Sequence, residues 1–403
     1  MARADSVGGS FFLSGEECLR VPHFGLGGAI SRPGCSCLPV CGRLRAMGFL
    51  PSDESERSDA VLFAERLVFG PLLFQGVVSL RRRGVLQKLL RRGGEGATLE
   101  TLLGELELSR YGLTVLLEAG LAAGVLQVDD EGVYRLARVG LLFERDPMTI
   151  ANLDFVADVC YRAAAHLDAS LDSGEARGLR ELSDEENVYQ ALSTLPEPAK
   201  TSWFAFDHFY SDRAFKDLVP RLSARAPKQV LDVGANTGRF ACALLAADER
   251  VRVTLADLPN QLAVARRELE ERGLSARAHF HPIDLLSPEL SLPEGFDVIW
   301  MSQLLCCFGE EDVLRILRAA ARALGPGGEL WIVDTFWDRQ KQRAAAVTLM
   351  GTSLYFTTVA NGRGRMYDSA TMLRLAQEAG LSVKSVEDSL GLGHSCIVCG
   401  SAR

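Results

Sequence analysis

Residues 230–240 read VLDVGANTGRF, and this stretch decides the fold of the C-terminal half of the chain. Val230–Val233 is a short apolar run typical of a buried β-strand, and Gly234 allows a tight turn into a following helix. Backbone N–H groups in such a turn, at the N-terminus of a helix, can approach a ligand closely. Glycine turns also occur in crossovers that bind nothing, so the neighbouring sequence must decide between the two interpretations.

A second strand favours the ligand-binding interpretation. Residues 251–256 are apolar and lead directly to Asp257, which comes 19 residues after Gly238. In βαβ units that bind nucleosides, an acid at about this spacing accepts hydrogen bonds from the ribose hydroxyls. Strand, glycine turn, helix, strand and acid in this order predict a nucleoside-binding unit, with a purely structural crossover as the alternative.

The composition excludes several classes of protein. The 403 residues suffice for two or three domains, and 47% hydrophobic with 24% charged residues is typical of globular proteins. A net charge of −8 argues against a general nucleic-acid binder. No apolar run reaches the roughly 18 residues of a membrane span, and the N-terminus lacks the pattern of a signal peptide. We therefore predict a cytoplasmic protein without nucleic-acid or membrane partners, whose ten cysteines are reduced.

Residues 1–57 show Gly, Ser and Pro clusters and no sustained periodicity, which predicts a disordered N-terminal extension. Four cysteines lie here, at positions 18, 35, 37 and 41. The spacing C-x-C-x₃-C with a distant fourth cysteine is not a standard zinc-ligand spacing. We therefore predict no metal site.

Residues 58–146 have the pattern of a small helical domain that ends in a β-hairpin. After a first helix, the sequence predicts one continuous helix from Phe74 to Leu89, and Ser109 can cap the helix over residues 110–120. Residues 124–136 then form a predicted hairpin. This order is typical of a winged helix. Because helix 110–120 carries only one basic residue, we interpret the domain as a dimerisation unit rather than a DNA reader.

Residues 147–222 are predicted to be a helical linker rich in aromatic residues, most densely over residues 203–210, which include His208. Aromatic residues most often belong to a core, but here they could also cap a pocket for a flat aromatic acceptor. Residues 223–403 alternate strand and helix, which predicts a doubly wound α/β sheet with its ligand at the carboxyl ends of the strands. The predicted strands are residues 229–233, 251–256, 278–281, 296–300, 329–334, 381–387 and 395–398.

Three motifs carry a family resemblance: the glycine turn after the first strand, Asp284-Leu285 after the third, and LGPGGEL at residues 324–330 before the fifth. Together they resemble the class I S-adenosylmethionine-dependent methyltransferases. With the N-terminal domain, the chain from about residue 58 onward resembles the small-molecule O-methyltransferases that carry an N-terminal winged-helix dimerisation domain. The resemblance implies a Rossmann-like sheet, a homodimer, and S-adenosyl-L-methionine as the cofactor.

The same resemblance implies which residues bind the cofactor. The glycine turn would approach its methionine end, the acid after the second strand its ribose, and the acid after the third strand its adenine. Asn236 takes the place of the middle glycine, and Ser302 takes the place of a lysine. The implied cofactor-binding residues are Asp232, Gly234, Asn236, Gly238, Asp257, Leu258, Asp284, Leu285 and Ser302.

The chain departs from the family at the catalytic base. Cys306 stands where the resemblance places the base histidine, and Asp334 matches one of the two acids that orient this histidine, while the other falls at Met366. A thiol is a poor substitute, because its unperturbed pKa is about 8.5 and its thiolate is itself a nucleophile. His208 and Tyr367 are the other candidate bases. Alternatively, the acceptor arrives already ionised and needs no base, so that proximity and orientation are the main contributions to catalysis.

The resemblance predicts methyl transfer to a small aromatic metabolite, phenolic or polyketide-like, of secondary metabolism. O-methylation is favoured, and aromatic C-methylation is the alternative because the histidine is absent. Residues 354–367 could contribute to the acceptor site or form a basic surface loop. A hypothesis from another functional class also remains open, namely that the protein is a non-catalytic winged-helix regulator that senses a ligand.

Overall fold

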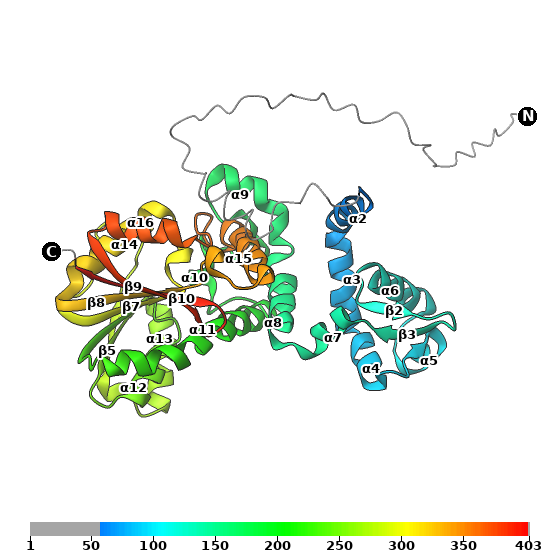
Figure 1. The fold of residues 1–403 in the computed structure, drawn as a ribbon, viewed down its shortest axis with the longest axis horizontal. Helices are drawn as coiled ribbons and strands as arrows, with labels where there is room; N and C mark the ends of the chain where they lie inside the picture. Colours follow the sequence, from blue (N-terminus) through cyan, green and yellow to red (C-terminus); the bar gives the residue numbers. More distant parts are fainter. Residues whose placement is uncertain (1–56, 402–403) are drawn as a thin grey trace, which may run out of the picture. The chain divides into compact units, whose positions relative to one another are not determined.

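The computed structural model describes residues 57–401 (Figure 1). The predicted disordered extension, apart from its last residue, and the four cysteines at positions 18–41 lie outside the described residues.

The N-terminal part is a helical domain with a small sheet. Its elements are α2 (Arg57–Val68), α3 (Gly70–Arg82), α4 (Val85–Arg92), β1 (Ala97–Thr98), α5 (Leu99–Glu105), α6 (Arg110–Ala122), β2 (Leu126–Val128), β3 (Val133–Leu136) and α7 (Arg138–Arg145). The side chain of Ser109 caps α6 as predicted, because its Oγ accepts a hydrogen bond from the backbone N–H of Gly112 at 3.0 Å. The strands pair antiparallel in the order β1-β3-β2. Leucines of α3, α4 and α6 form the core of this part.

One prediction for this domain is wrong. The helix expected from Phe74 to Leu89 is two helices, α3 and α4, because Gly84 interrupts it with a left-handed backbone at φ = 76°. Glycine adopts this conformation at little steric cost, and the chain changes direction there.

The central part is helical and runs from α8 to α11. Its elements are α8 (Pro147–Phe155), the π-helical turn η1 (Val156–Cys160), η2 (Ala163–His166), α9 (Leu167–Ser173), η3 (Arg177–Glu181), α10 (Val188–Ala191) and α11 (Ala199–Ala224). The 26-residue helix α11 carries the dense aromatic stretch and leads into the first strand of the large sheet.

The C-terminal part is a seven-stranded sheet in the order β6-β5-β4-β7-β8-β10-β9. The strands are β4 (Gln229–Val233), β5 (Arg252–Asp257), β6 (Ala278–Pro282), β7 (Phe296–Ser302), β8 (Leu324–Asp334), β9 (Leu381–Leu390) and β10 (His394–Ser401). The first five in spatial order are parallel, whereas β10 runs antiparallel to both of its neighbours. The predicted α/β sheet is therefore confirmed.

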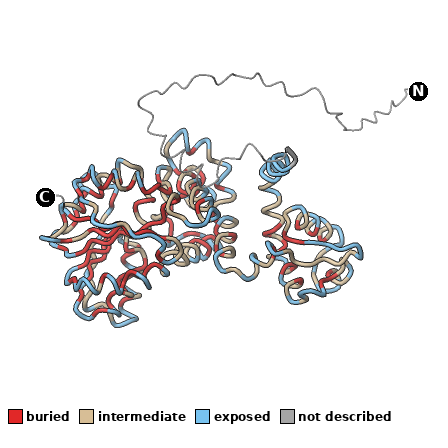
Figure 2. Tube along the Cα trace, viewed as in Figure 1, coloured by how far each residue is buried: buried red, intermediate tan, exposed pale blue. Residues whose placement is uncertain are grey.

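Helices cover both faces of this sheet, and most of its buried residues lie on the inner strands β5, β4, β7, β8 and β10 (Figure 2). The helices are α12 (Arg239–Ala247), α13 (Pro259–Glu271), α14 (Glu310–Ala323), α15 (Arg343–Tyr355) and α16 (Ser369–Glu378), with the short turns η4 (Ser275–Arg277), η5 (Leu305–Cys307), η6 (Trp337–Arg339) and η7 (Phe356–Ala360). Side chains alternate along each strand, so that Leu231 and Val233 pack in one hydrophobic cluster and Val230 in the other.

The start of one strand differs from the prediction. Strand β8 begins at Leu324 rather than at Glu329, so residues 324–328 extend the strand. The side chain of Asp368 caps α16, because its Oδ1 accepts a hydrogen bond from the N–H of Thr371 at 3.0 Å.

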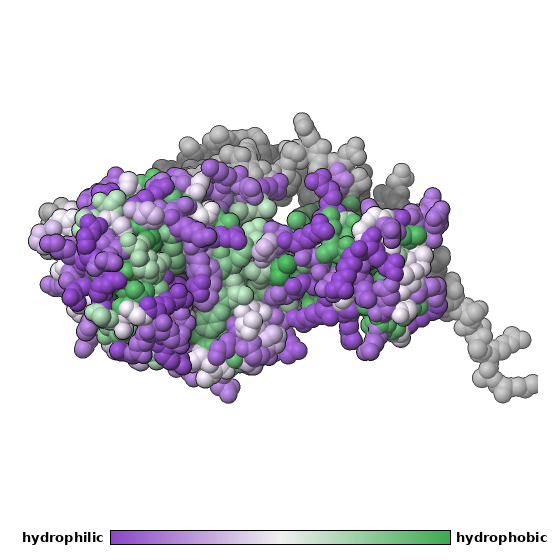
Figure 3. All heavy atoms as spheres, turned by 90° about the horizontal axis from the view of Figure 1, so that it is seen from below, coloured by the Kyte–Doolittle hydropathy of each residue, from purple (hydrophilic) through white to green (hydrophobic). Residues whose placement is uncertain are grey.

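The surface is mixed in character. Figure 3 shows one face, on which apolar side chains lie in separate patches among hydrophilic ones. No single helix of the described residues is long and apolar enough to cross a membrane; the helices at 59–68 and 70–82 meet that test only together, across a bend of 68°.

Candidate functional site

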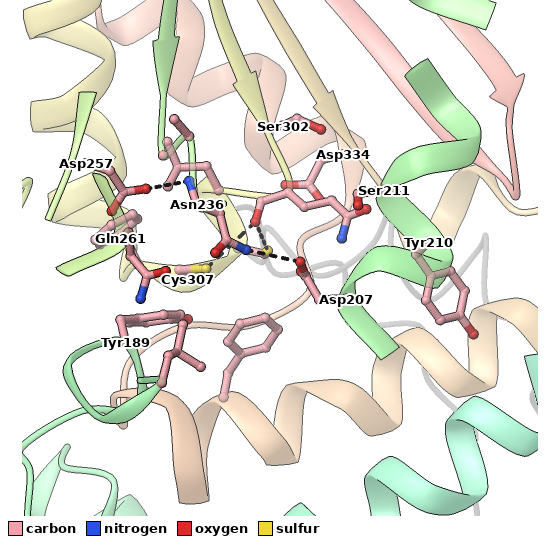
Figure 4. Close-up of a pocket in the computed structure, with 18 of the residues that line it drawn as sticks. Tyr189, Asp207, Tyr210, Ser211, Asn236, Asp257, Gln261, Ser302, Cys307 and Asp334 are labelled. Carbon is pink, nitrogen blue, oxygen red and sulfur yellow. Dashed lines mark hydrogen bonds between the residues drawn. The ribbon is translucent and has the colours of Figure 1, made fainter. Parts of the chain in front are cut away.

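A cavity of about 410 Å³ opens at the carboxyl ends of β4, β5 and β7. The strand order reverses between β4 and β7, and such a switch point is where open α/β sheets bind ligands. Helices α11 and α15 and the turn η5 supply the other walls (Figure 4).

The glycine turn after β4 forms one end of the cavity. The backbone N–H of Asn236 donates to Asp257 Oδ2 at 2.7 Å, and the N–H of Leu258 donates to Asp257 Oδ1 at 2.6 Å. Burial nevertheless raises the pKa of Asp257 to about 6. A half-buried carboxylate that still has free lone pairs is suited to accept hydrogen bonds from the hydroxyls of a ligand.

Buried polar atoms without a partner gather at this cavity. Seven such side-chain atoms occur in the described part of the chain, and five of them belong to residues that line the cavity: Tyr189 Oη, Asp232 Oδ2, Asn236 Oδ1, Trp300 Nε1 and Ser302 Oγ. Leaving a buried polar atom unpaired costs about 1–3 kcal/mol. Their concentration here indicates that a polar ligand supplies the missing partners.

Asp232 lies at the end of β4, at the base of the turn. Burial raises its pKa well above the usual range, and the nearby charge of Asp257 raises it further. Two acids this close cannot both ionise easily, unless a cationic or hydrogen-donating ligand lies between them.

The structure brings most of the predicted cofactor-binding residues to the cavity. Asp284 lies on its rim with Oδ1 bound to the N–H of Leu286 at 2.8 Å, and Leu285 is buried beside it. Gly238 is not among the lining residues. Its left-handed backbone starts α12, and an added Cβ would meet Ala265 at 3.0 Å, so the glycine allows α12 and α13 to pack closely.

Cys306 is a buried thiol. Its Sγ donates to the carbonyl of Gln303 at 3.6 Å, and its pKa is raised well above the usual range by the hydrogen bond with Cys307, by burial and by the charge of Asp334. The residue at the expected base position is thus a neutral thiol at physiological pH. Asp334 lines the cavity beside it, and burial raises the pKa of Asp334 to about 7.

The two other candidate bases differ in their positions. His208 lines the cavity with its Nε2 3.5 Å from Thr237 Oγ1, and burial lowers its pKa, so its imidazole is neutral. Tyr367 does not line the cavity. Its hydroxyl donates to the carbonyl of Phe308 at 2.6 Å, and burial raises its pKa.

Aromatic side chains of α8, α11 and α15 form a second part of the cavity, which is called its aromatic end below. Phe155 stacks on Phe206 with ring centroids 4.0 Å apart, and Trp203 Nε1 donates to the hydroxyl of Tyr355 at 2.7 Å. The same side chains therefore belong to a hydrophobic cluster and also line the cavity.

The side chains of residues 354–367 face in two directions. Tyr355, Phe356, Asn361 and Met366 line the cavity. The arginines of the segment point elsewhere, since Arg365 pairs with Glu310 at 2.9 Å and Arg363 donates to the carbonyl of Gly174 at 3.3 Å.

Two cavity residues were missed as candidate site residues. Asp207 is a carboxylate within the aromatic stretch of α11, and Tyr189 carries a buried hydroxyl without a partner. An acid inside an otherwise aromatic run was a signal for Asp207, whereas nothing in the sequence distinguishes Tyr189 from a core tyrosine. Within residues 57–401, no group of three or more His, Cys, Asp and Glu side chains could hold a metal ion.

Comparison with known families agrees with this geometry. The family model described as a methyltransferase domain matches residues 206–386, and the one described as a Dimerisation2-like domain matches residues 62–133.

Individual relatives extend the comparison. The L-tyrosine C(3)-methyltransferase of Streptomyces lavendulae is 25% identical over 325 residues, which cover 80% of this chain and 87% of the relative. The 3-amino-4-hydroxybenzoate 4-O-methyltransferase of Streptomyces cremeus is 26% identical over 272 residues, which cover 65% of this chain and 69% of the relative. The crystal structure of the S-adenosylmethionine-dependent methyltransferase SibL is 27% identical with a TM-score of 0.63, covering 84% of this chain and 98% of that one.

Proposed function

Because the chain belongs to the S-adenosylmethionine-dependent methyltransferases of the small-molecule type, we propose that it methylates a small aromatic metabolite, with O-methylation favoured. S-adenosylmethionine supplies a methyl group on a sulfonium, which is already a good electrophile.

The observation that carries this proposal is the set of unpaired polar atoms at the cavity. Asp232 Oδ2, Asn236 Oδ1 and Ser302 Oγ are buried without partners next to the glycine turn. An amino-acid and ribose ligand offers the donors that these acceptors lack, so the residues present fit the cofactor. Asp257 would hold the ribose hydroxyls, Asp284 with Leu285 the adenine, and the turn the methionine end.

The aromatic end of the cavity would hold the acceptor. Phe155, Trp203, Phe206 and Tyr355 present flat apolar surfaces, which favour stacking with an aromatic ring. These walls also exclude water, so the chain contributes mainly by orienting and desolvating the acceptor next to the methyl donor.

C-methylation is the second candidate, and two observations favour it. Cys306 is a neutral, buried thiol at the position of the base, and a relative aligned over most of both chains is named a C-methyltransferase. A ring carbon ortho to a phenol can also accept the methyl group.

The first test is methyl transfer itself. The protein is incubated with ¹³C-methyl S-adenosylmethionine and a panel of phenols: L-tyrosine, 3-amino-4-hydroxybenzoate, catechol and 4-nitrocatechol. We expect calorimetry to show binding of S-adenosylhomocysteine, and at least one phenol to gain a labelled methyl group. NMR of the product separates methoxy from aryl-methyl carbon. A protein that binds neither form of the cofactor would contradict the proposal.

A further inference from the structure

The carboxylate of Asp207 lines the cavity and pairs with no cation in the described part of the chain. Asp207 lies on α11 and accepts a single hydrogen bond, from Asn236 Nδ2 to its Oδ2 at 3.2 Å (Figure 4). The cation that acts on it, Arg239, is instead bound to Asp212 through both Nε, at 2.8 Å, and Nη2. The Oδ1 of Asp207 is therefore available to a ligand in the cavity.

Asp207 lies at the junction of the two ends of the cavity. Its partner Asn236 belongs to the turn that would hold the cofactor. Trp203, one helical turn before it, and Phe206, immediately before it, belong to the aromatic end with Tyr355. Methyl transfer must take place where donor and acceptor meet, and the contacts of Asp207 place its carboxylate at that boundary.

The surroundings of Asp207 suit it to exchange a proton near neutral pH. Burial raises its pKa to about 7, the charge of Asp212 adds to this, and Arg239 and Asn236 lower it. A base works best when its pKa lies near the working pH. The titratable groups that act on it are Asp212 on the same helix, Arg239 of α12 and Tyr355 of α15. His208, Cys306, Cys307 and Asp334 line the same cavity.

The other groups at the cavity are less suited to this role. The carboxylate of Asp334 accepts hydrogen bonds from the backbone N–H groups of Thr335 and Cys306, which hold its oxygens. Cys306 is a neutral thiol bound to the carbonyl of Gln303. Asp207 is the carboxylate held by a single side-chain amide.

Building on the proposed function, we propose that Asp207 is the general base that removes the proton from the acceptor hydroxyl. The proton passes to Oδ1 of Asp207 while the acceptor oxygen forms a bond to the methyl carbon. The carbon–sulfur bond of the donor breaks, and its electron pair stays on sulfur. The products are the methyl ether, the protonated carboxyl of Asp207 and neutral S-adenosylhomocysteine, and solvent then removes the proton.

The test compares Asp207→Asn with wild type on two phenols, catechol and 4-nitrocatechol, whose nitro group makes its hydroxyl ionise near neutral pH. With catechol, we expect kcat/KM to fall about 10²–10⁴-fold, the range that general bases contribute. With 4-nitrocatechol, which needs no base, the loss is expected to be far smaller. The wild-type profile of kcat/KM falls as pH decreases through about 7, and the variant lacks this limb.

A second readout needs no turnover. The absorbance of 4-nitrocatechol reports its ionisation when it binds together with S-adenosylhomocysteine at a pH below its solution pKa. Wild type is expected to generate the phenolate and Asp207→Asn is not. Asp212→Asn provides a matched variant outside the cavity: it removes one negative charge and releases Arg239, and both changes lower the pKa of Asp207. The acidic limb of its profile is therefore expected to move to lower pH.

Two results would overturn this assignment. If Asp207→Asn weakens S-adenosylhomocysteine binding tenfold or more and leaves the pH profile unchanged, the carboxylate holds the α-ammonium group of the cofactor. If both catechols lose activity equally, the role of Asp207 is structural. Failure of the proposed function differs from both, because wild type itself would then neither bind S-adenosylhomocysteine nor methylate any phenol.

Discussion

Asp257 is the proposed ribose-binding residue, and its contacts define the position of its carboxylate. Both of its oxygens accept hydrogen bonds from backbone N–H groups, which fix its orientation, and burial raises its pKa to about 6. The same contacts explain the conformation of Asn236, which has a left-handed backbone at φ = 47° and directs its N–H at this carboxylate. The acid thus organises the turn as well as offering lone pairs to a ligand.

We predict that Asp257→Ala weakens S-adenosylhomocysteine binding roughly 10- to 100-fold, since hydrogen bonds to a charged group contribute about 1.5–3 kcal/mol. Titration calorimetry measures this directly. Asp130→Ala, in the exposed turn between β2 and β3, serves as the control and is expected to bind like wild type. Equal affinity of Asp257→Ala and wild type would remove Asp257 from the cofactor site.

Among the elements, the turn η5 packs closely against the segment after η7, residues 361–367. The N–H of Arg365 donates to the carbonyl of Cys306 at 2.9 Å, and the side chain of Asn361 donates to the carbonyl of Cys307. A Cβ at Gly364 would lie 2.5 Å from the carbonyl oxygen of Cys306, which belongs to the backbone and cannot rotate away. This glycine therefore allows a cavity-lining segment to approach η5.

We predict that Gly364→Ala destabilises the protein by about 1–3 kcal/mol, the usual cost of overpacking, and lowers activity because Asn361 and Met366 shift. Gly351→Ala in α15 is the matched control. It has open space around its Cβ position, and alanine in a helix is expected to stabilise by about 0.5–1 kcal/mol. Chemical denaturation of both variants measures the difference, and equal stabilities would contradict the close approach.

Sequence reasoning predicted the elements better than the site. The bounds of β4 agree with the prediction, because an apolar run before a glycine turn is a local signal. The break at Gly84 was missed, since a single glycine within a helical pattern does not reveal its backbone conformation. The position of Asp207 in the cavity depends on the packing of α11 against the glycine turn, whose Asn236 lies 29 residues later in the chain. Tyr367 lies outside the cavity because its hydroxyl donates to the carbonyl of Phe308. Such contacts are tertiary, so periodicity does not encode them. The domain boundaries predicted after residues 146 and 222 stay predictions.

For the whole molecule, the exposed apolar helix α2 has the clearest consequence. Phe63, Leu67 and Val68 are each about 70% exposed, although they are large and apolar. The Dimerisation2-like domain that includes them is matched from residue 62 onward. A helix of this composition is more stable when a second apolar surface covers it, and we propose that a second copy of the chain does so.

We predict that wild type is a dimer of twice the monomer mass of 43.8 kDa and that Phe63→Asp with Leu67→Asp shifts it to the monomer, because buried unpaired carboxylates destabilise an apolar interface. Light scattering measures both masses. Glu65→Lys, on the same exposed helix, controls for a change of charge alone. A monomeric wild type, or a double variant that stays dimeric, would contradict this assignment.

The π-helical turns η1 and η7 directly follow α8 and α15, whose last residues, Phe155 and Tyr355, line the aromatic end of the cavity. A π turn holds one residue more than an α turn over the same rise. Deleting that residue would restore α geometry and rotate the helix before the turn by about 100° relative to the chain after it, given 3.6 residues per turn. A single codon lost or gained at either turn could therefore exchange a whole set of wall side chains while the sheet and its glycine turn stay intact. Relatives with different acceptors can thus diverge in evolution by length as well as by substitution.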